Sequence, residues 1–206
     1  MTVIIDYGMG NLFSVENALK TLGGDIKVSG KPEDIRAADR IILPGVGAFP
    51  DGMKNLKNLG LVEILREEVL EKRKPFLGIC LGMQLLASEG EEHEPTKGLG
   101  FIEGRVRRFQ TDEKKFRIPH IGWNDVLAGK DSILFKDLEN PVFYFVHSYH
   151  FVPEDKDNIA ATCDYGEIFA AAVRKENIFG VQFHPEKSQK SGLKLLENFL
   201  NYKNHA

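Results

Sequence analysis

The sequence is poor in cysteine and lacks the residue spacings of a metal site. Cys80 and Cys163 are the only two cysteines among 206 residues. Two cysteines make no disulfide framework, and free thiols suit a reducing cytosol. No CxxC, HExxH or comparable ligand spacing occurs. We therefore expect neither a metal nor a cofactor.

Long apolar runs and a strong charge of either sign are also missing. No segment approaches the roughly 20 apolar residues of a membrane-spanning helix. The first residues lack the basic and apolar regions of a signal peptide. The net charge of −3 gives no electrostatic reason to expect nucleic acid or an anionic membrane as a partner. These observations predict a cytoplasmic protein that binds neither.

What the sequence does contain is the ordinary composition of a globular protein. Hydrophobic residues make up 42% of the chain and charged residues 28%. A length of 206 residues is enough for one sizeable core, and no linker, repeat or low-complexity segment divides it. We expect one domain over residues 1–206.

The first half alternates short apolar runs with glycine-rich loops and helical patterns. The pattern predicts strands at 3–5, 26–28, 40–43 and 75–79. It predicts helices at 12–22, 32–37 and 51–72, the last broken at Gly60. Such alternation is typical of a mostly parallel sheet with helices on both faces. Sheets of this kind place their sites at the carboxyl ends of the strands, where the glycine-rich loops fall.

The second half reads as β-structure followed by one helix. Short β-like runs occur at 101–102, 105–107, 118–121 and 142–146, and a β meander is predicted at 159–163, 169–173 and 178–183. A final helix from about Ser188 to Tyr202 carries a predicted buried stripe of Leu193, Leu196, Phe199 and Leu200. We expect both halves to join one mixed sheet system.

Cys80 lies between Gly78 and Gly82, where a buried strand turns into a helix predicted from Leu81 through Ala87. This is the Gly-x-nucleophile-x-Gly elbow with cysteine in place of serine. The turn places the sulfur at a helix amino end, where free N–H groups favour a thiolate and could hold an oxyanion. An inert cysteine in a tight turn is the alternative at this stage. Cys163 has no basic neighbour in its apolar run, so we expect it in the core.

His184 and Glu186 follow the last apolar strand and could supply a base and its orienting carboxylate. His184 can accept and return a proton near neutral pH. Glu186 could bind the other imidazole nitrogen and fix its tautomer. Together with Cys80 they would form a cysteine version of the nucleophile, base and orienter triad.

The two motifs together resemble the class I, or triad, glutamine amidotransferases. The segment from Gly78 to Gln84 holds the cysteine, and the segment from Gly180 to Glu186 holds the histidine and the glutamate. Their order and their separation of about a hundred residues match that family. The resemblance implies a flavodoxin-like α/β fold with catalytic Cys80, His184 and Glu186. It also implies hydrolysis of glutamine to glutamate and ammonia through a cysteine thioester.

Further segments resemble one branch of this family, the glutaminase subunits of imidazole glycerol phosphate synthase in histidine biosynthesis. These segments are 6–12, 44–49, 118–124 and 145–150, so the likeness covers essentially the whole chain. The resemblance implies a heterodimer with a (β/α)8 cyclase subunit that receives the ammonia. We expect one glutaminase domain to take up the whole given sequence, which would leave no room in it for a synthetase domain.

The resemblance also implies individual roles. An oxyanion hole would use the Leu81 N–H and, after a backbone flip, the loop with Val46 and Gly47. Glycines on both sides of Val46 make such a flip sterically cheap. Glutamine would be bound by Gly45, Gln84, Glu92, Ser148 and Tyr149. The cyclase interface would include Asn11, Trp123 and Asn124, although core packing is an equal alternative for Trp123.

Two other function classes remain open from the sequence. The same triad could serve a different ammonia acceptor, as in anthranilate, aminodeoxychorismate, formylglycinamidine or pyridoxal phosphate synthesis. The loops at 6–11 and 44–49 weigh against this. The third reading is a cysteine hydrolase or peptidase, or a binding module on the same fold. An intact set of Cys80, His184 and Glu186 weighs against a module without activity.

Overall fold

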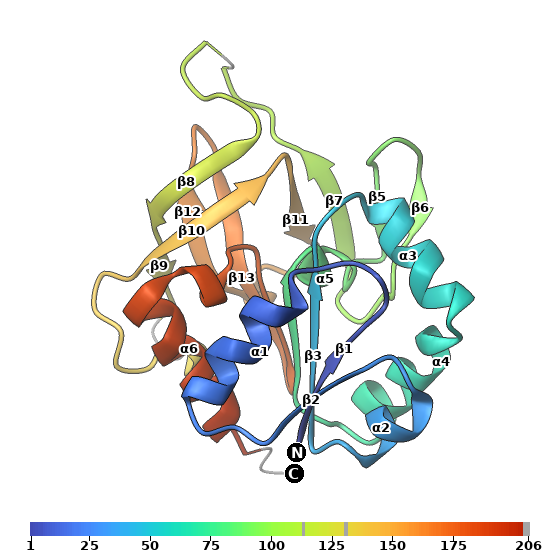
Figure 1. The fold of residues 1–206 in the computed structure, drawn as a ribbon. Helices are drawn as coiled ribbons and strands as arrows, with labels where there is room; N and C mark the ends of the chain where they lie inside the picture. Colours follow the sequence, from blue (N-terminus) through green and yellow to red (C-terminus); the bar gives the residue numbers. More distant parts are fainter. Residues whose placement is uncertain (113, 130–131, 204–206) are drawn as a thin grey trace.

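A computed structural model describes residues 1–112, 114–129 and 132–203, and it is built around an eight-stranded mixed sheet (Figure 1). The strand order is β2-β1-β3-β4-β14-β13-β12-β9. The parallel part consists of β2 (Ile26–Ser29), β1 (Thr2–Ile5), β3 (Arg40–Gly45), β4 (Phe76–Cys80) and β14 (Ile178–Val181). The antiparallel part consists of β13 (Ile168–Lys175), β12 (Ile159–Asp164) and β9 (Leu127–Ala128).

Helices cover both faces of this sheet. Successive residues of β1 point to opposite faces of the sheet and so enter two separate cores. On one face Ile4 packs with α1 (Leu12–Thr21) and α6 (Gln189–Asn201). Val3 and Ile5 pack on the other side with α2 (Pro32–Ala37), α3 (Phe49–Asn58) and α4 (Leu61–Arg66). A π-helical turn, η1 (Glu67–Glu71), extends α4. The predicted α/β class with a mostly parallel sheet is therefore confirmed, as is the break at Gly60, which adopts a left-handed conformation.

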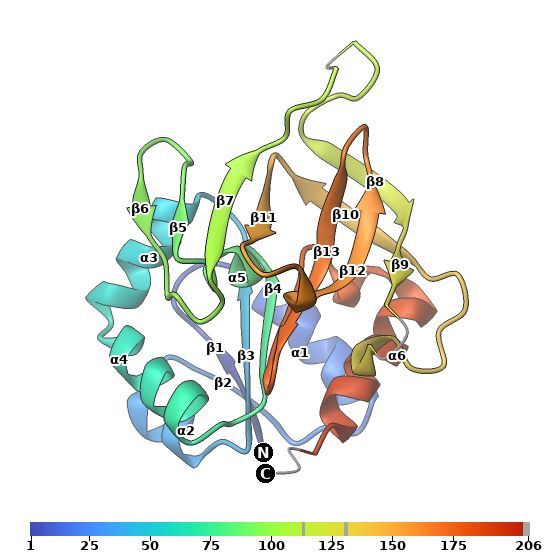
Figure 2. The same ribbon diagram turned by 180° about the vertical axis from the view of Figure 1, so that it is seen from behind.

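Two smaller sheets stand above the carboxyl ends of the parallel strands (Figure 2). One pairs β8 (His120–Asp125) with β10 (Val142–His147). The other has the order β11-β7-β5-β6, from Tyr149–Pro153, Gly104–Arg108, Glu89–Gly90 and Thr96–Lys97. The meander β12-β13-β14 joins the main sheet as expected, whereas these two sheets are separate from it. In the part of the chain that the structure describes there are also three short 3-10 helices: η2 (Ile133–Phe135), η3 (Lys156–Asn158) and η4 (Pro185–Lys187).

The structure corrects three local predictions. The helix after Cys80, α5, spans only Leu81–Gln84 instead of reaching residue 87. It ends early because the freed carbonyl of Leu86 accepts the N–H groups of Phe101 and Ile102, at 2.9 and 3.1 Å. For the same reason 101–102 is a loop packed on the helix end and is not a strand. In α6 the fully buried leucine beside Leu196 is Leu195, while Leu193 and Leu200 are only partly covered.

None of the helices in the described part of the chain is both long enough and apolar enough to cross a bilayer.

Candidate active site

Cys80 is the last residue of β4 and stands in a strained turn. Its φ of 54° and ψ of −110° lie outside the regions that non-glycine residues favour. The turn is possible only with glycine on both sides. A Cβ on Gly78 would lie 2.4 Å from the carbonyl oxygen of Gly82, and one on Gly82 would lie 1.8 Å from that of Leu43. The geometry is that of a nucleophile elbow, as the sequence predicts.

The sheet holds this strained turn in place. Strand β4 lies inside the main sheet, between β3 and β14, and all five of its residues are buried. Cys80 pairs with Gly45 in the register of β3 and β4. Such surroundings can maintain a backbone conformation that costs about 1–3 kcal/mol.

His184 and Glu186 reach the site from the neighbouring strand. They follow β14, and the Nδ1 atom of His184 lies 2.8 Å from Oε1 of Glu186. Both side chains are almost completely buried. Burial lowers the pKa of His184, but its interactions with Cys80 and Glu186 outweigh burial and raise this pKa to about 10. Apart from its interaction with Cys80, the buried Nε2 atom has no hydrogen-bond partner among the described residues, so this nitrogen is left to serve the thiol.

A cavity of about 360 Å³ opens onto the sulfur. Every residue predicted for the oxyanion hole and for glutamine binding lines it, except Gly45: these are Val46, Gly47, Leu81, Gln84, Glu92, Ser148 and Tyr149. Gly45 lies behind them, where an added Cβ would meet the hydroxyl of Tyr7 at 2.3 Å. Pro119, Val146 and His147 also line the cavity and were not predicted. All three lie in the segments 118–124 and 145–150 already identified by resemblance, although none of them was assigned a role there.

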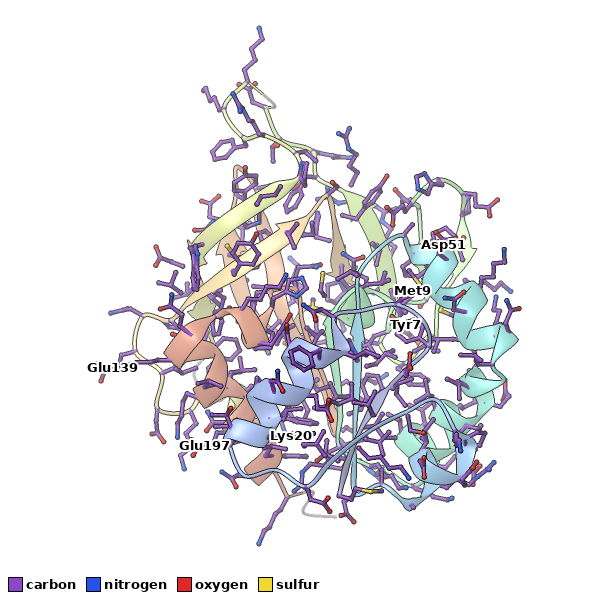
Figure 3. The ribbon with its side chains drawn as sticks, viewed as in Figure 1. Tyr7, Met9, Lys20, Asp51, Glu139 and Glu197 are labelled. Atoms are coloured by element: carbon purple, nitrogen blue, oxygen red, sulfur yellow. The ribbon has the colours of Figure 1, made fainter. Side chains whose placement is uncertain are left out.

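The loop after β3 forms one wall of this cavity and is steadied by the loop after β1. Val46 is 43% exposed, and Gly47 has a φ of 109°, which suits glycine. A Cβ on Gly47 would lie 2.7 Å from the methyl group of Met9. Figure 3 labels Met9 and Tyr7 at the upper ends of the parallel strands, well away from Glu197 and Lys20. The two glycine-rich loops that the sequence predicts at this sheet edge are therefore packed together.

Glu92 accepts a backbone hydrogen bond and also faces the cavity. Its Oε2 atom accepts the N–H of Phe49 at 2.8 Å, at the amino end of α3, while the side chain also lines the cavity. A carboxylate in this position satisfies one of the free donors of the helix and interacts favourably with its dipole. Glu92 therefore has a structural role at the start of α3, and its side chain also lines the cavity.

The predicted interface residues lie outside the cavity. Asn11 is exposed, and its side chain accepts the N–H of Ser14 as the amino-terminal cap of α1. Trp123 is 49% exposed, so it is not a core residue, and its ring meets that of Tyr144 edge-on. Asn124 donates to the carbonyl oxygen of Asp164 at 3.1 Å.

Cys163, in contrast to Cys80, is a core residue. Burial and two nearby aspartates raise the pKa of its thiol to about 12. Its environment fits the predicted packing role. In the described residues no group of histidine, cysteine and acidic side chains could hold a metal ion.

Comparison with known families identifies this arrangement. The model of the class I glutamine amidotransferases matches residues 3–202. The chain belongs to this family.

Curated relatives narrow the assignment. The chain is 51% identical over 201 residues to the imidazole glycerol phosphate synthase subunit HisH 2 of Methanococcus maripaludis, with 97% of this chain and 98% of that protein covered. It is 50% identical over 200 residues to the HisH subunit of Aquifex aeolicus, with 96% of this chain and 95% of that protein covered. The chain is therefore a HisH subunit of imidazole glycerol phosphate synthase, the branch that the sequence predicts. The readings as a glutaminase for another acceptor, a peptidase or a binding module are not supported.

Two further comparisons concern the partner and the fold. The chloroplastic hisHF protein of Arabidopsis thaliana is 49% identical over 205 residues, which cover 98% of this HisH chain and 34% of that protein. The crystal structure of a glutamine amidotransferase superposes with a TM-score of 0.76 at 23% sequence identity, and the match covers 96% of each chain. The structure of PurLQS from Thermotoga maritima superposes with a TM-score of 0.74 at 21% sequence identity, and the match covers 98% of this chain and 97% of that one. These structures share the fold, and the subunit name implies a partner within the synthase.

Proposed function

We propose that Cys80, His184 and Glu186 hydrolyse L-glutamine in the 360 Å³ cavity and that the ammonia passes to a (β/α)8 cyclase subunit. The observation that supports this most strongly is the buried His184–Glu186 pair next to a cysteine in a nucleophile elbow. The whole chain, residues 1–206, would act as one glutaminase domain in the cytoplasm.

The first step forms a thioester. The Cys80 thiol gives its proton to Nε2 of His184, and the sulfur attacks the side-chain amide carbon of glutamine. Glu186 accepts a hydrogen bond from Nδ1–H and stabilises the imidazolium. The raised pKa of His184, about 10, means that the ring holds this proton readily until the leaving group needs it. His184 then protonates the departing nitrogen, and ammonia leaves.

When the sulfur attacks, negative charge develops on the oxygen of the glutamine side-chain amide, and N–H donors close to that oxygen must stabilise it. Leu81 begins α5, so its N–H has no acceptor within the helix and can donate to this oxygen. We assign the second donor to the peptide between Val46 and Gly47, two residues that also line the cavity. The two glycines that flank Val46 allow this peptide to turn when the partner binds its own substrate.

The second step regenerates the enzyme. Water enters where ammonia has left, gives a proton to His184 and attacks the thioester, and glutamate and the free thiol are released. Glu92 would bind the α-ammonium group of glutamine, and the side chains of Gln84, Ser148 and Tyr149 would bind the rest of the amino-acid end. All four line the cavity.

Ammonia must reach its acceptor before it is protonated and lost. In the proposed heterodimer the cyclase uses it to convert a phosphoribulosyl-formimino aminoimidazole carboxamide ribotide to imidazole glycerol phosphate and an aminoimidazole carboxamide ribotide. Asn11, Trp123 and Asn124 would contact this partner. The exposed ring of Trp123 fits such a role, since aromatic side chains are enriched in interfaces.

The test compares glutamine and ammonium salts as nitrogen sources for the reconstituted synthase. With Cys80→Ala we expect imidazole glycerol phosphate to form from ammonium salt and not from glutamine. Wild-type subunit should use both. Formation of product from glutamine by Cys80→Ala would overturn the assignment of the nucleophile, and failure of the wild-type pair with both sources would overturn the proposed partner.

A further inference from the structure

A buried amide outside the lining of the cavity contacts the nucleophile. Gln182 has no exposed surface, and its Nε2 atom lies 3.7 Å from the sulfur of Cys80, within the range of an N–H···S hydrogen bond. It stands just after β14, two residues before His184. It does not line the cavity, so it contacts the sulfur without occupying the space for substrate.

The hydrogen bonds behind Gln182 fix which end of its amide faces the sulfur. The backbone carbonyl of Tyr149 can only accept, so the group of Gln84 that lies 2.9 Å from it must be the amide nitrogen. The same nitrogen of Gln84 donates to Oε1 of Gln182 at 3.0 Å. With its oxygen engaged there, Gln182 presents its N–H groups to Cys80.

A second donor holds the same carbonyl. Nδ1 of His147 lies 2.8 Å from the oxygen of Tyr149. Burial lowers the pKa of His147 well below its ordinary value, so the ring is neutral and donates through Nδ1–H. Its Nε2 then accepts from Nδ1 of His120 at 3.1 Å. The carbonyl oxygen of Tyr149, which orients Gln84, thus accepts hydrogen bonds from two buried side chains.

We propose that Gln182 donates a hydrogen bond to the Cys80 sulfur that stabilises the thiolate and sets its position for attack, with Gln84 orienting the amide. This rests on the proposed role of Cys80 as the nucleophile. Removing the donor costs the charged form of the sulfur more than the neutral form, because hydrogen bonds to charged groups are the stronger ones. A side chain that merely fills space would leave the ionisation of the thiol unchanged.

The experiment measures the rate at which iodoacetamide alkylates Cys80 as a function of pH, with the label located by peptide mass spectrometry. The variant is Gln182→Met, which keeps the length of the side chain and removes its donor. We expect the pH midpoint to rise by about one unit, so that the alkylation rate at pH values well below the midpoint falls about tenfold. In glutamine hydrolysis kcat should fall while KM stays within about twofold, since Gln182 does not line the cavity.

Asn177 provides the matched control. It is also a buried amide, and it donates to the carbonyl oxygens of Val69 and Lys74 at 2.9 and 2.8 Å, at the opposite end of β14. Asn177→Leu removes comparable hydrogen bonds, and we expect it to lower stability without moving the alkylation midpoint.

An unchanged midpoint in folded Gln182→Met would overturn the proposal, as would an equal shift in Asn177→Leu. If Gln182→Met does not fold, Gln84→Met takes its place, because it releases the oxygen of Gln182 and should raise the midpoint by a smaller amount. No shift in that variant would be equally decisive. Alkylation needs no glutamine, so the result stands apart from the test of the proposed function.

Discussion

Nδ1 of His184 lies 2.8 Å from Oε1 of Glu186, across a backbone separation of two residues and almost entirely out of contact with solvent. The short connection through Pro185 leaves the ring little freedom to turn away. A buried carboxylate in this position fixes the tautomer with Nε2 as the proton acceptor. Several consequences of this arrangement and of the surrounding fold can be measured.

Glu186→Gln should lower kcat for glutamine hydrolysis by about 10²-fold or more, because the neutral amide no longer stabilises the imidazolium. KM should change little, since Glu186 does not line the cavity. Steady-state kinetics with the partner present would measure this. Glu197→Gln, on α6 and outside the lining of the cavity, is the matched control and should keep full activity. A kcat within twofold of wild type for Glu186→Gln would exclude the orienting role.

Glu92→Gln should separate the structural role of this residue from its proposed binding role. The amide oxygen can still accept the N–H of Phe49, so the unfolding free energy should stay within about 1 kcal/mol. The lost charge should raise KM for glutamine about tenfold, because the α-ammonium loses its counter-ion. Glu91→Gln changes the same charge on the neighbouring exposed residue and should leave KM unchanged. Equal KM values for Glu92→Gln and wild type would remove Glu92 from the substrate site.

Gly82→Ala should be one of the most damaging small substitutions in the chain. Its Cβ would lie 1.8 Å from the carbonyl oxygen of Leu43, and neither backbone can move without disturbing the sheet. We expect a loss of about 3 kcal/mol or more of unfolding free energy in urea titrations. Gly60→Ala, with a φ of 67° and no atom within 4 Å of the new Cβ, should lose only about 1–2 kcal/mol from backbone strain. Similar losses in the two variants would show that the tight approach at the elbow is not what demands glycine.

Acid should destabilise the protein through its buried histidines. Burial lowers the pKa of His120 to about 4, whereas in the unfolded chain it titrates near its ordinary value of 6.5. Between these values the unfolded state binds the proton and the folded state does not, so stability falls as the pH drops from about 6.5 to 4. His120→Phe, whose ring can keep the stack with Phe145, should lose less stability over this range than wild type. Urea midpoints at several pH values would measure it, and identical pH slopes for both proteins would contradict it.

The pH dependence of His184 has the opposite sign. Its folded pKa, about 10, lies above the ordinary value of 6.5. The stabilisation from its interactions with Cys80 and Glu186 is therefore fully present below about pH 6.5 and is lost as the pH rises through 10. The difference in unfolding free energy between wild type and His184→Gln should accordingly shrink from pH 7 to pH 10.5. A constant difference over this range would contradict the raised pKa.

Much of the fold could be predicted because the first half repeats a simple pattern. Apolar runs such as 3–5 and 40–43, each followed by glycines and a helical period, leave few alternatives to a parallel sheet. The early end of α5 could not be predicted from local sequence. It depends on the carbonyl oxygen of Leu86, which accepts hydrogen bonds from N–H groups 15 or more residues further along the chain. The two smaller sheets depend in the same way on pairings between distant segments.

The site divides similarly. Cys80, His184 and Glu186 stand out because their neighbours, Gly78, Gly82 and Pro185, impose special backbone geometry. Gln182 is in the same short motif as His184, yet only the structure shows that its amide nitrogen points to the sulfur. Gly45 was expected among the binding residues, and the structure places it behind the cavity wall because strand β3 extends through it.

The most direct test of the account is the covalent intermediate itself. The subunit, with its partner and the ribotide ligand, would be mixed with glutamine, quenched in acid during turnover and analysed by peptide mass spectrometry. We predict one γ-glutamyl group on the peptide that contains Cys80, and none on the corresponding peptide of Cys80→Ala. Turnover of glutamine without any such adduct on Cys80, or hydrolysis by Cys80→Ala, would contradict the central claim.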